Sequence, residues 1–265
     1  MPQIIFTRRV RAGFVALIGL LSLAGCGGDE SAFVEVPPGP ATQVEITGSV
    51  GDGPVTAASI VVTNNIAEVL AEFQSDMSGG YSVTVEARDT HYPLFVSATG
   101  GTDLVSNMAP DFEMLGAAIE PGTRAIANVN PLTTLIIELA RDLDGGLSID
   151  NIRAAEATVL VAMDTGLVTM RAGGPLATPV DASNISEVVR ASEVLAEIVR
   201  RTRDLLMGTA SATDADGVIR AIGSDLVDGV VEGSGGARSD ARTAAVANIV
   251  SAQVLLESMA NELHV

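Results

Sequence analysis

The chain contains no lysine, so chemistry that depends on a lysine amine is excluded. This removes P-loop nucleotide binding, Schiff-base catalysis and serine–lysine dyads. Tryptophan is also absent and tyrosine occurs twice, so aromatic platforms for stacking sugars or bases are scarce. No hydrolase nucleophile motif of the G-x-S-x-G type occurs either. We therefore assign no catalytic residue and no cofactor from the sequence.

Cysteine and histidine are nearly absent. Cys26 is the single cysteine, so no disulfide within the chain is possible. His91 precedes a predicted strand and His264 lies next to the C-terminus, so a two-histidine metal site is not expected. We assign no metal ligand.

Positive charge is scarce. The chain has 15 basic residues, all arginine, against 33 acidic residues. Three of the arginines lie in the first 25 residues, which contain no acid, so the remaining chain carries 12 against 33, a formal charge of −21. Nucleic acids and anionic lipid surfaces are therefore not expected partners.

The first 25 residues have the layout of an export signal. Arg8, Arg9 and Arg11 precede an apolar stretch, Phe14–Leu23, that is too short for a membrane-spanning helix, which needs roughly 20 residues. Small residues then lead to Cys26. Such a segment is either an ordinary cleaved signal, in which case Cys26 is incidental, or a signal that ends at a cysteine to which lipid is attached.

The segment Leu23-Ala24-Gly25-Cys26 resembles the lipobox of bacterial lipoproteins. The resemblance implies a signal peptide at residues 1–25 and lipid on Cys26, which would anchor the chain to a membrane. Gly27 stands where the inner-membrane retention signal of enteric lipoproteins has Asp, which favours the outer membrane. The resemblance leaves open whether the protein faces the periplasm or the exterior.

Residues 26–41 are rich in Gly, Pro and acids and predict a flexible tether. Residues 42–130 alternate with a period of two, and Gly-rich turns separate the runs. The alternating residues are Val44, Ile46, Ile60, Val62, Tyr81, Val83, Val85, Leu94, Val96 and Ala98. Several short strands of this kind predict an antiparallel β-sandwich.

The stretch Asp76-Met77-Ser78-Gly79-Gly80-Tyr81, with Ile46–Val50 and Ala58–Val62 before it, resembles the carboxypeptidase regulatory-like, Ig-type family. In that family the Asp and Gly shape the turn of a hairpin and the Tyr enters the core. The resemblance implies an accessory or spacer module without catalytic residues.

From residue 131 the apolar period becomes 3.6. Asn130 is a good N-cap before Pro131, and an apolar face follows at Leu132, Leu135, Ile136, Leu139 and Leu143. Further helices are predicted at Ser148–Leu167, Ser183–Met207, Asp214–Val231 and Ser239–Leu263. These predict a small helical bundle over residues 131–265. The junction Asn128–Leu135 also resembles lipoproteins in which an Ig-like domain leads directly into a helical one, so we expect the two parts to pack together.

Three clusters of charge have two interpretations each. Asp142, Asp144 and Asp150, and Asp214 with Asp216, resemble fragments of calcium loops but lack ligands at both loop ends, so helix capping is the alternative. Arg200, Arg201 and Arg203 form either ion pairs with nearby acids or an anion site. Paired carboxylates among the 33 acids could hydrolyse a glycoside.

The sequence therefore predicts an α+β protein of two domains, an Ig-like antiparallel β-sandwich followed by a small helical bundle. We expect a lipid-anchored outer-membrane protein that acts as a non-catalytic binding or structural module. Two alternatives stay open: a carboxylate-dependent hydrolase of envelope polymers, and an accessory subunit that presents a helical groove to an envelope protein.

Overall fold

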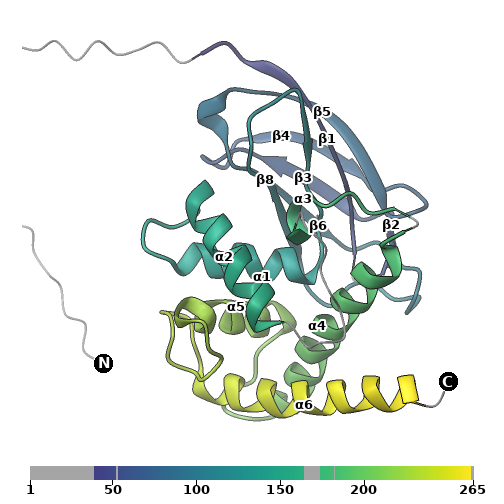
Figure 1. Cartoon of the computed structure of the whole chain (residues 1–265), viewed down its shortest axis with the longest axis vertical. Coiled ribbons are helices and arrows are strands. Elements are labelled where there is room, and N and C mark those ends of the chain that lie inside the picture. Colours follow the sequence, from purple (N-terminus) through teal and green to yellow (C-terminus); the bar gives the residue numbers. More distant parts are fainter. Residues whose placement is uncertain (1–38, 52, 164–173, 182, 264–265) are drawn as a thin grey trace, which may run out of the picture. The chain divides into compact units, whose positions relative to one another are not determined.

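The computed structural model describes residues 39–51, 53–163, 174–181 and 183–263. Residues Pro38–Val265 form one compact unit. The predicted signal peptide, the predicted lipid attachment site at Cys26, most of the predicted tether and the C-terminal His264 lie outside the described residues. The unit is a mixed α+β fold, with strands in its N-terminal part and helices in its C-terminal part (Figure 1).

The strands form two main sheets and a small ladder. The first sheet has the order β5-β1-β9 and the second the order β4-β3-β6-β8. The bounds are β1 Thr42–Ser49, β2 Val55–Thr56, β3 Ser59–Thr63, β4 Val69–Gln74, β5 Gly80–Ala87, β6 Leu94–Thr99, β7 Thr102–Asp103, β8 Met114–Ala118 and β9 Arg124–Ile126. The small ladder joins β2 and β7.

Most pairings are antiparallel, as predicted, but β1 and β9 are parallel, with Glu45 opposite Arg124. A parallel bridge between Val50 and Val129 continues this pair. The β1–β9 pair is parallel because of the path of the chain after β8. From this edge strand of the second sheet the chain crosses to the first sheet, and β9 then runs beside β1 in the same direction.

The period of two is confirmed by burial. The inward side chains of β1, β3 and β6 are at most 1% exposed, and those of Tyr81 and Val85 on β5 are buried. Val83 is only partly buried. Residues of both sheets join one core. Alternation predicts these strands correctly because one face of each sheet is buried and the other faces water.

The turn from Asp76 to Tyr81 is shaped by an aspartate and a glycine and leads into a buried tyrosine. Asp76 Oδ1 accepts hydrogen bonds from the Ser78 N–H at 2.7 Å and the Gly80 N–H at 2.9 Å, and Gly79 has a φ of +76°. The Ser78 hydroxyl and N–H lower the pKa of Asp76. Tyr81 is buried and its hydroxyl donates to the Ala127 carbonyl. The predicted hairpin is wrong, because β4 pairs with β3 and β5 with β1, so this turn joins the two sheets.

Five of the helices lie within the predicted ranges. The helix bounds are α1 Pro131–Asp142, α2 Ile149–Ala162, α3 Gly174–Ala177, α4 Ile185–Leu206, α5 Ala215–Asp225 and α6 Ala241–Leu263, with short 3₁₀ turns at Asp89–His91 and Leu226–Asp228. The predicted apolar face of α1 is buried at Leu132, Leu135, Ile136 and Leu139. On α6, however, the periodic residues Ile249, Leu256 and Met259 are exposed and not buried. The sequence did not predict α3, since Gly173-Gly174-Pro175 indicated a break; proline is compatible with a first helical turn.

The junction between strands and helices is fixed by hydroxyl groups. Asn130 caps α1 by accepting from the Thr133 N–H at 3.0 Å, in a capping box. Thr134 Oγ1 accepts from the Leu115 N–H at 2.8 Å, and Thr133 Oγ1 donates to the Leu115 carbonyl at 2.6 Å. These two threonines satisfy the N–H and the carbonyl of Leu115 on the outer edge of β8. The expected packing of the helices against the strands is therefore present.

Asn128 ties the first sheet to α3. Its side-chain oxygen accepts from the Ser49 N–H at 3.3 Å, and its amide donates to the carbonyls of Pro175 and Thr178 at 3.1 and 2.7 Å. The chain here passes so close to β8 that a Cβ on Gly116 would lie 2.1 Å from the Asn128 carbonyl oxygen. Glycine is therefore required at that position.

Candidate functional site

The aspartates that resembled calcium-loop fragments serve other roles. Asp214 caps α5 by accepting from the Gly217 N–H at 2.7 Å, and Ser148 caps α2. Asp142 binds Arg238 through the Nε–Oδ1 contact at 3.0 Å. The capping interpretation is confirmed for Asp214. Within the described ranges, no three His, Cys, Asp or Glu side chains are grouped as metal ligands would be. His91 lies partly buried in a 3₁₀ turn.

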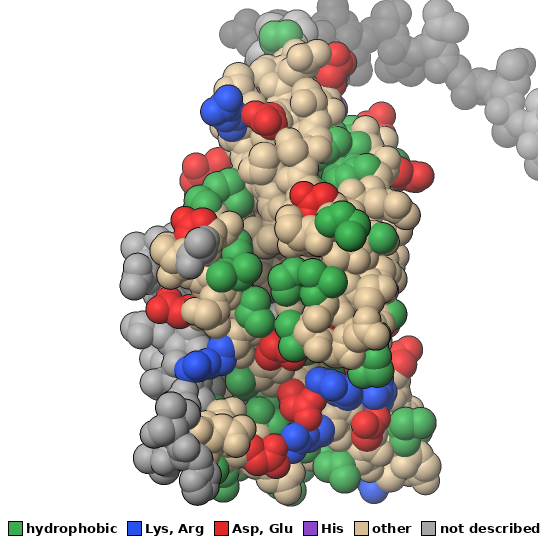
Figure 2. Space-filling model, turned by 90° about the vertical axis from the view of Figure 1, so that its right-hand side faces the viewer, with side chains coloured by type: hydrophobic (Ala, Val, Ile, Leu, Met, Phe, Trp, Pro, Cys, Tyr) green, Lys and Arg blue, Asp and Glu red, His purple; other side chains and the backbone are tan. Residues whose placement is uncertain are grey.

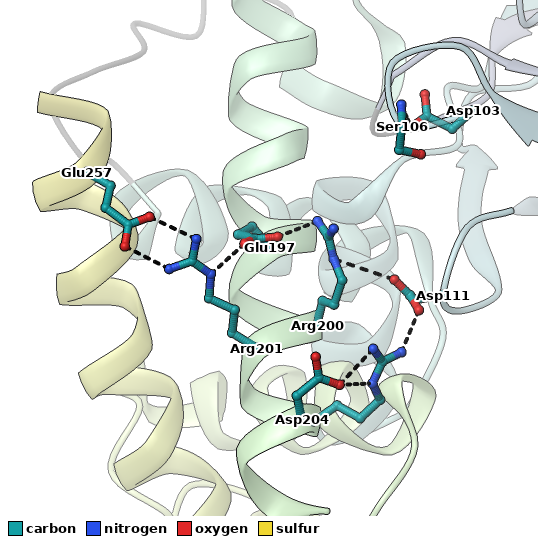
Figure 3. Close-up of polar contacts among 9 residues, drawn as sticks. Asp103, Ser106, Asp111, Glu197, Arg200, Arg201, Asp204 and Glu257 are labelled. Atoms are coloured by element: carbon teal, nitrogen blue, oxygen red, sulfur yellow. Dashed lines mark hydrogen bonds and ion pairs between the residues drawn. The ribbon is translucent and has the colours of Figure 1, made fainter. Parts of the chain in front are cut away.

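The arginine run on α4 forms an ion-pair network (Figure 3). Arg200 pairs with Glu197 and lies 3.6 Å from Asp111, while Arg203 pairs with Asp111 and Asp204. Arg201 bridges α4 to α6 through Glu197 and Glu257, with bonds of 2.8 and 2.9 Å to the latter. The ion-pairing interpretation of this run is therefore confirmed.

The same network shifts the pKa of the groups that it joins. The hydrogen bond from Arg201 lowers the pKa of Glu257, and the hydrogen bonds from Glu257 and Glu197 raise the pKa of Arg201. A hydrogen bond to Asp111 raises the pKa of Arg203. Each arginine of the run thus has acidic partners, and an anionic ligand would have to displace them.

A second cluster surrounds Glu138, which is 2% exposed. Arg238 donates to its carboxylate at 2.6 Å and to its backbone carbonyl at 3.0 Å, and Arg141 lies 3.6 Å away. Asp142 accepts from the same Arg238; burial by itself would raise the pKa of Asp142, but the hydrogen bonds from Ser224 and Arg238 lower it. This cluster ties the loop before α6 to the end of α1.

A cavity of about 740 Å³ opens where the two sheets separate, and we call it the edge cavity. The segment from β8 to β9 forms one side, β1 forms the floor, and α2 and α3 close the other side. Its lining residues are Glu45, Thr47, Ala117, Ala118, Ile119, Glu120, Arg124, Ala125, Ile126, Arg153, Glu156 and Ala177. The size is that of a small-molecule site.

The charges that line the edge cavity are matched except for one. Arg124 pairs with Glu45 at 3.3 Å, and Arg153 pairs with Glu120 at 3.2 Å. Glu156 has no arginine partner among the described residues. Among the described residues, its carboxylate accepts a single, long hydrogen bond of 3.4 Å from the Leu176 N–H of α3.

Burial raises the pKa of Glu156, and the Leu176 hydrogen bond opposes this shift without cancelling it. The carboxylate also lies directly over Gly174, where a Cβ would meet its oxygen at 2.2 Å. Gly174 has a φ of +65°, a backbone conformation that favours glycine, and a larger residue there would displace the end of the Glu156 side chain. The start of α3 is thus shaped around the carboxylate.

Two apolar surfaces lie elsewhere. A groove of about 690 Å³ runs between β1 and the start of α4, with Pro54, Ile185 and Val189 among its lining residues. The face that carries α4 shows hydrophobic side chains at mid-height and charges of both signs below them (Figure 2). In the loop after β7, Leu104 and Val105 are 56% and 62% exposed.

The outer face of α6 is also apolar. Ile249, Leu256 and Met259 are 50% to 66% exposed, while Val250 and Val254 on the opposite face pack against α4. Over Ala241–Asn261 this helix is long and apolar enough to cross a membrane by length and composition alone. Among the described helices it is the single one with that property.

No family model, curated protein or solved structure matches this chain. The functional reasoning therefore rests on the residues themselves. Sequence reasoning missed the edge cavity, because its charged residues come from segments far apart in the chain. Glu156 gives no signal in sequence, since a glutamate on a short amphipathic helix is ordinary.

Proposed function

We propose that this chain is a lipid-anchored protein of the outer membrane whose folded unit acts as a non-catalytic binding module. The lipobox resemblance at Cys26 and the preceding signal pattern support the anchor. The edge cavity supports the binding role, because it is large enough for a small ligand and contains one unpaired carboxylate. The observation that carries the proposal is the combination of an export signal with this cavity.

The matched charges favour binding over catalysis. Acid–base hydrolysis by two carboxylates needs one protonated and one ionised group, both free to reach the substrate. In the edge cavity, Glu45 and Glu120 are each occupied by an arginine. Only Glu156 is free of such a partner within the described residues, which suits one contact to a ligand.

The anchor is tested by intact mass and membrane partition after expression in a bacterial host. Wild type should gain acyl mass and sediment with outer membrane, and Cys26→Ser should lose both properties. A matched control, Cys26→Ser with Ser31→Cys, keeps one cysteine outside the lipobox and should behave like Cys26→Ser. Wild type without acyl mass would overturn the anchor.

A carboxylate-dependent hydrolase of envelope polymers is the second candidate. The observation in its favour is the raised pKa of Glu156, which suits a general acid, in a cavity that also holds Glu45 and Glu120. The test is release of soluble fragments from purified envelope polymers. Activity that is lost in both Glu156→Gln and Glu120→Gln would establish the hydrolase over the binding module.

An accessory role toward another envelope protein is the third candidate. The exposed apolar residues of α6, Ile249, Leu256 and Met259, favour it, since such a stripe is typical of a helix with a partner. Crosslinking in intact cells that depends on Ile249 and Leu256 would support this role. Unchanged crosslinking in Ile249→Gln with Leu256→Gln would exclude this face.

We also propose that residues 42–130 form an Ig-like sandwich of the carboxypeptidase regulatory-like type and that residues 131–265 form a helical domain. The two sheets and the turn at Asp76–Tyr81 support the first assignment. Limited proteolysis tests it, since two domains would give separate stable fragments. Cleavage that unfolds the whole unit at once would count against a two-domain arrangement.

A further inference from the structure

We propose that the edge cavity binds a small organic ammonium ion with an apolar body, and that the Glu156 carboxylate holds the ammonium group. This inference rests on the proposed binding function and names its ligand class. Three observations carry it: a carboxylate without an ion-pair partner among the described residues, the matched charges around it, and the apolar side chains in the cavity lining.

The first step concerns charge. An ionised carboxylate that is half removed from water needs a cation or several hydrogen bonds. Within the described part of the chain, Glu156 has one long hydrogen bond and no ion pair with an arginine; Arg153, one turn earlier on α2, pairs with Glu120 instead. A bound cation would supply the missing partner. The protein has no lysine, so an ammonium group must come from another molecule.

The second step concerns the sign of the ligand. Two arginines line the cavity, but Arg124 and Arg153 are already paired with Glu45 and Glu120. Both pairs lie toward the solvent, since the Arg124 side chain is 85% exposed and the Glu120 side chain 76%. An anionic ligand would have to break an existing pair, whereas a cationic ligand would not.

The third step concerns the body of the ligand. Among the lining residues, the apolar side chains that are at least partly exposed are small or aliphatic: Ile119, Ala125, Ile126 and Ala177. Alanines leave space and offer no hydrogen bonds, so an alkyl or alicyclic body fits better than a polar one. A bare metal ion fits poorly, because no three ligating side chains are grouped in the described ranges.

The test uses full-length chain carrying Cys26→Ser and labelled at the alanine methyl groups. The probes are hexylammonium, 1-hexanol and hexanoate, titrated at neutral pH and followed by NMR. Hexylammonium should shift the methyl resonances of Ala125 and Ala177 and bind at least tenfold more tightly than hexanol. The charge-assisted contact accounts for this difference.

The variants separate charge from shape. Glu156→Gln keeps the size of the side chain and should weaken hexylammonium at least tenfold while hexanol is unchanged. Glu257→Gln is the matched control on α6 and should bind hexylammonium like wild type. If Glu156→Gln does not fold, the relative affinities of wild type for hexylammonium and hexanol still test the ligand class.

The outcomes also separate this inference from the proposed function. Hexylammonium that binds no more tightly than hexanol, or equally well to Glu156→Gln, overturns the ligand class but leaves the cavity a binding site. If hexanoate binds most tightly of the three probes, the ammonium ligand class is likewise overturned, and the cavity is still a binding site. If none of the three probes shifts the cavity methyls, both the ligand class and the binding role of the cavity fail.

Discussion

Two glutamates on neighbouring helices, Glu138 of α1 and Glu156 of α2, differ in what surrounds them. Glu138 is almost fully buried and is held by Arg238, with Arg141 close by. Glu156 is half-buried and has a single long hydrogen bond from a backbone N–H. The comparison indicates that a carboxylate satisfied within the fold supports structure, and one left unsatisfied is available to a ligand.

The ion-pair network of α4 supports the same distinction. Its three arginines drew attention in the sequence because they are consecutive or nearly so, yet each is matched by acids from α4, α6 or the loop at Asp111. The density of charge in the sequence is thus a poor guide to function. The match between opposite charges, which only the fold sets, is the better guide.

The largest expected effect is that of Arg238→Met, which removes the main cation from Glu138 and Asp142. Breaking a buried ion pair from one side costs about 3–5 kcal/mol, and we expect the lower end because Arg141 remains near Glu138. Urea unfolding measures the change. Arg242→Met on the exposed start of α6 is the control, with a change below about 0.5 kcal/mol. Equal effects of the two variants would show that the cluster is not structural.

The next largest loss of stability is expected for Asn130→Ala, which tests an uncharged hydrogen bond at the junction between strands and helices. The substitution removes the cap of α1 and leaves the buried Thr133 N–H unsatisfied, at a cost of about 2 kcal/mol. Ser148→Ala removes the less buried cap of α2 and should cost about 1 kcal/mol or less. Thermal unfolding compares the two. A larger loss for Ser148→Ala would contradict the importance of this junction.

A smaller effect, of opposite sign, is expected for Glu156→Gln. Because burial raises the pKa of Glu156 above its ordinary value of 4.5, wild type should lose stability as the pH rises from that value through the raised pKa. The variant should lack this loss and be more stable at neutral pH by less than about 1 kcal/mol, since part of the group is exposed to solvent. Unfolding measured between pH 4 and 8 tests the slope. A steeper loss in the variant would mean that Glu156 is satisfied after all.

The smallest effect is expected for Glu257→Gln in the α4 network. Arg201 lowers the pKa of Glu257, so the pair supports the fold above the ordinary pKa of the carboxyl, and this support is lost as the pH falls. The Glu257 side chain is 58% exposed, so we expect the midpoint of unfolding to be unchanged at physiological salt. A clear drop in the midpoint at 0.15 M salt would place this network among the structural clusters.

Much of the fold could be predicted from local pattern. Alternation located β1, β3, β5 and β6, and the Asn130-Pro131 pair located the start of α1 to the residue. Alternation succeeds because one face of each of these strands is buried. The Asn130-Pro131 signal succeeds because a helix cap is a local interaction. The strands β4, β8 and β9 were missed, since Val69 and Leu70 break the alternation and Gly116 and Ala117 resemble a turn.

The candidate site could not be predicted for a different reason. Glu156 becomes distinct only because α3 places Gly174 and the Leu176 N–H against its carboxylate, and because the nearby arginines choose other partners. Those choices depend on contacts between segments separated by 30 residues or more, such as Arg153 with Glu120. A sequence lists the charges but does not state which of them meet.

The contact of Thr133 and Thr134 with Leu115 has a consequence for how this chain can be divided. A chain cut between Asn130 and Pro131 would leave the outer edge of β8 without those two hydroxyls, and an open strand edge invites aggregation. A strand-rich fragment that ends at Asn130 should therefore be less soluble than one that extends through the first turn of α1. Recombination that preserves solubility would have to carry the first turn of α1 along with it.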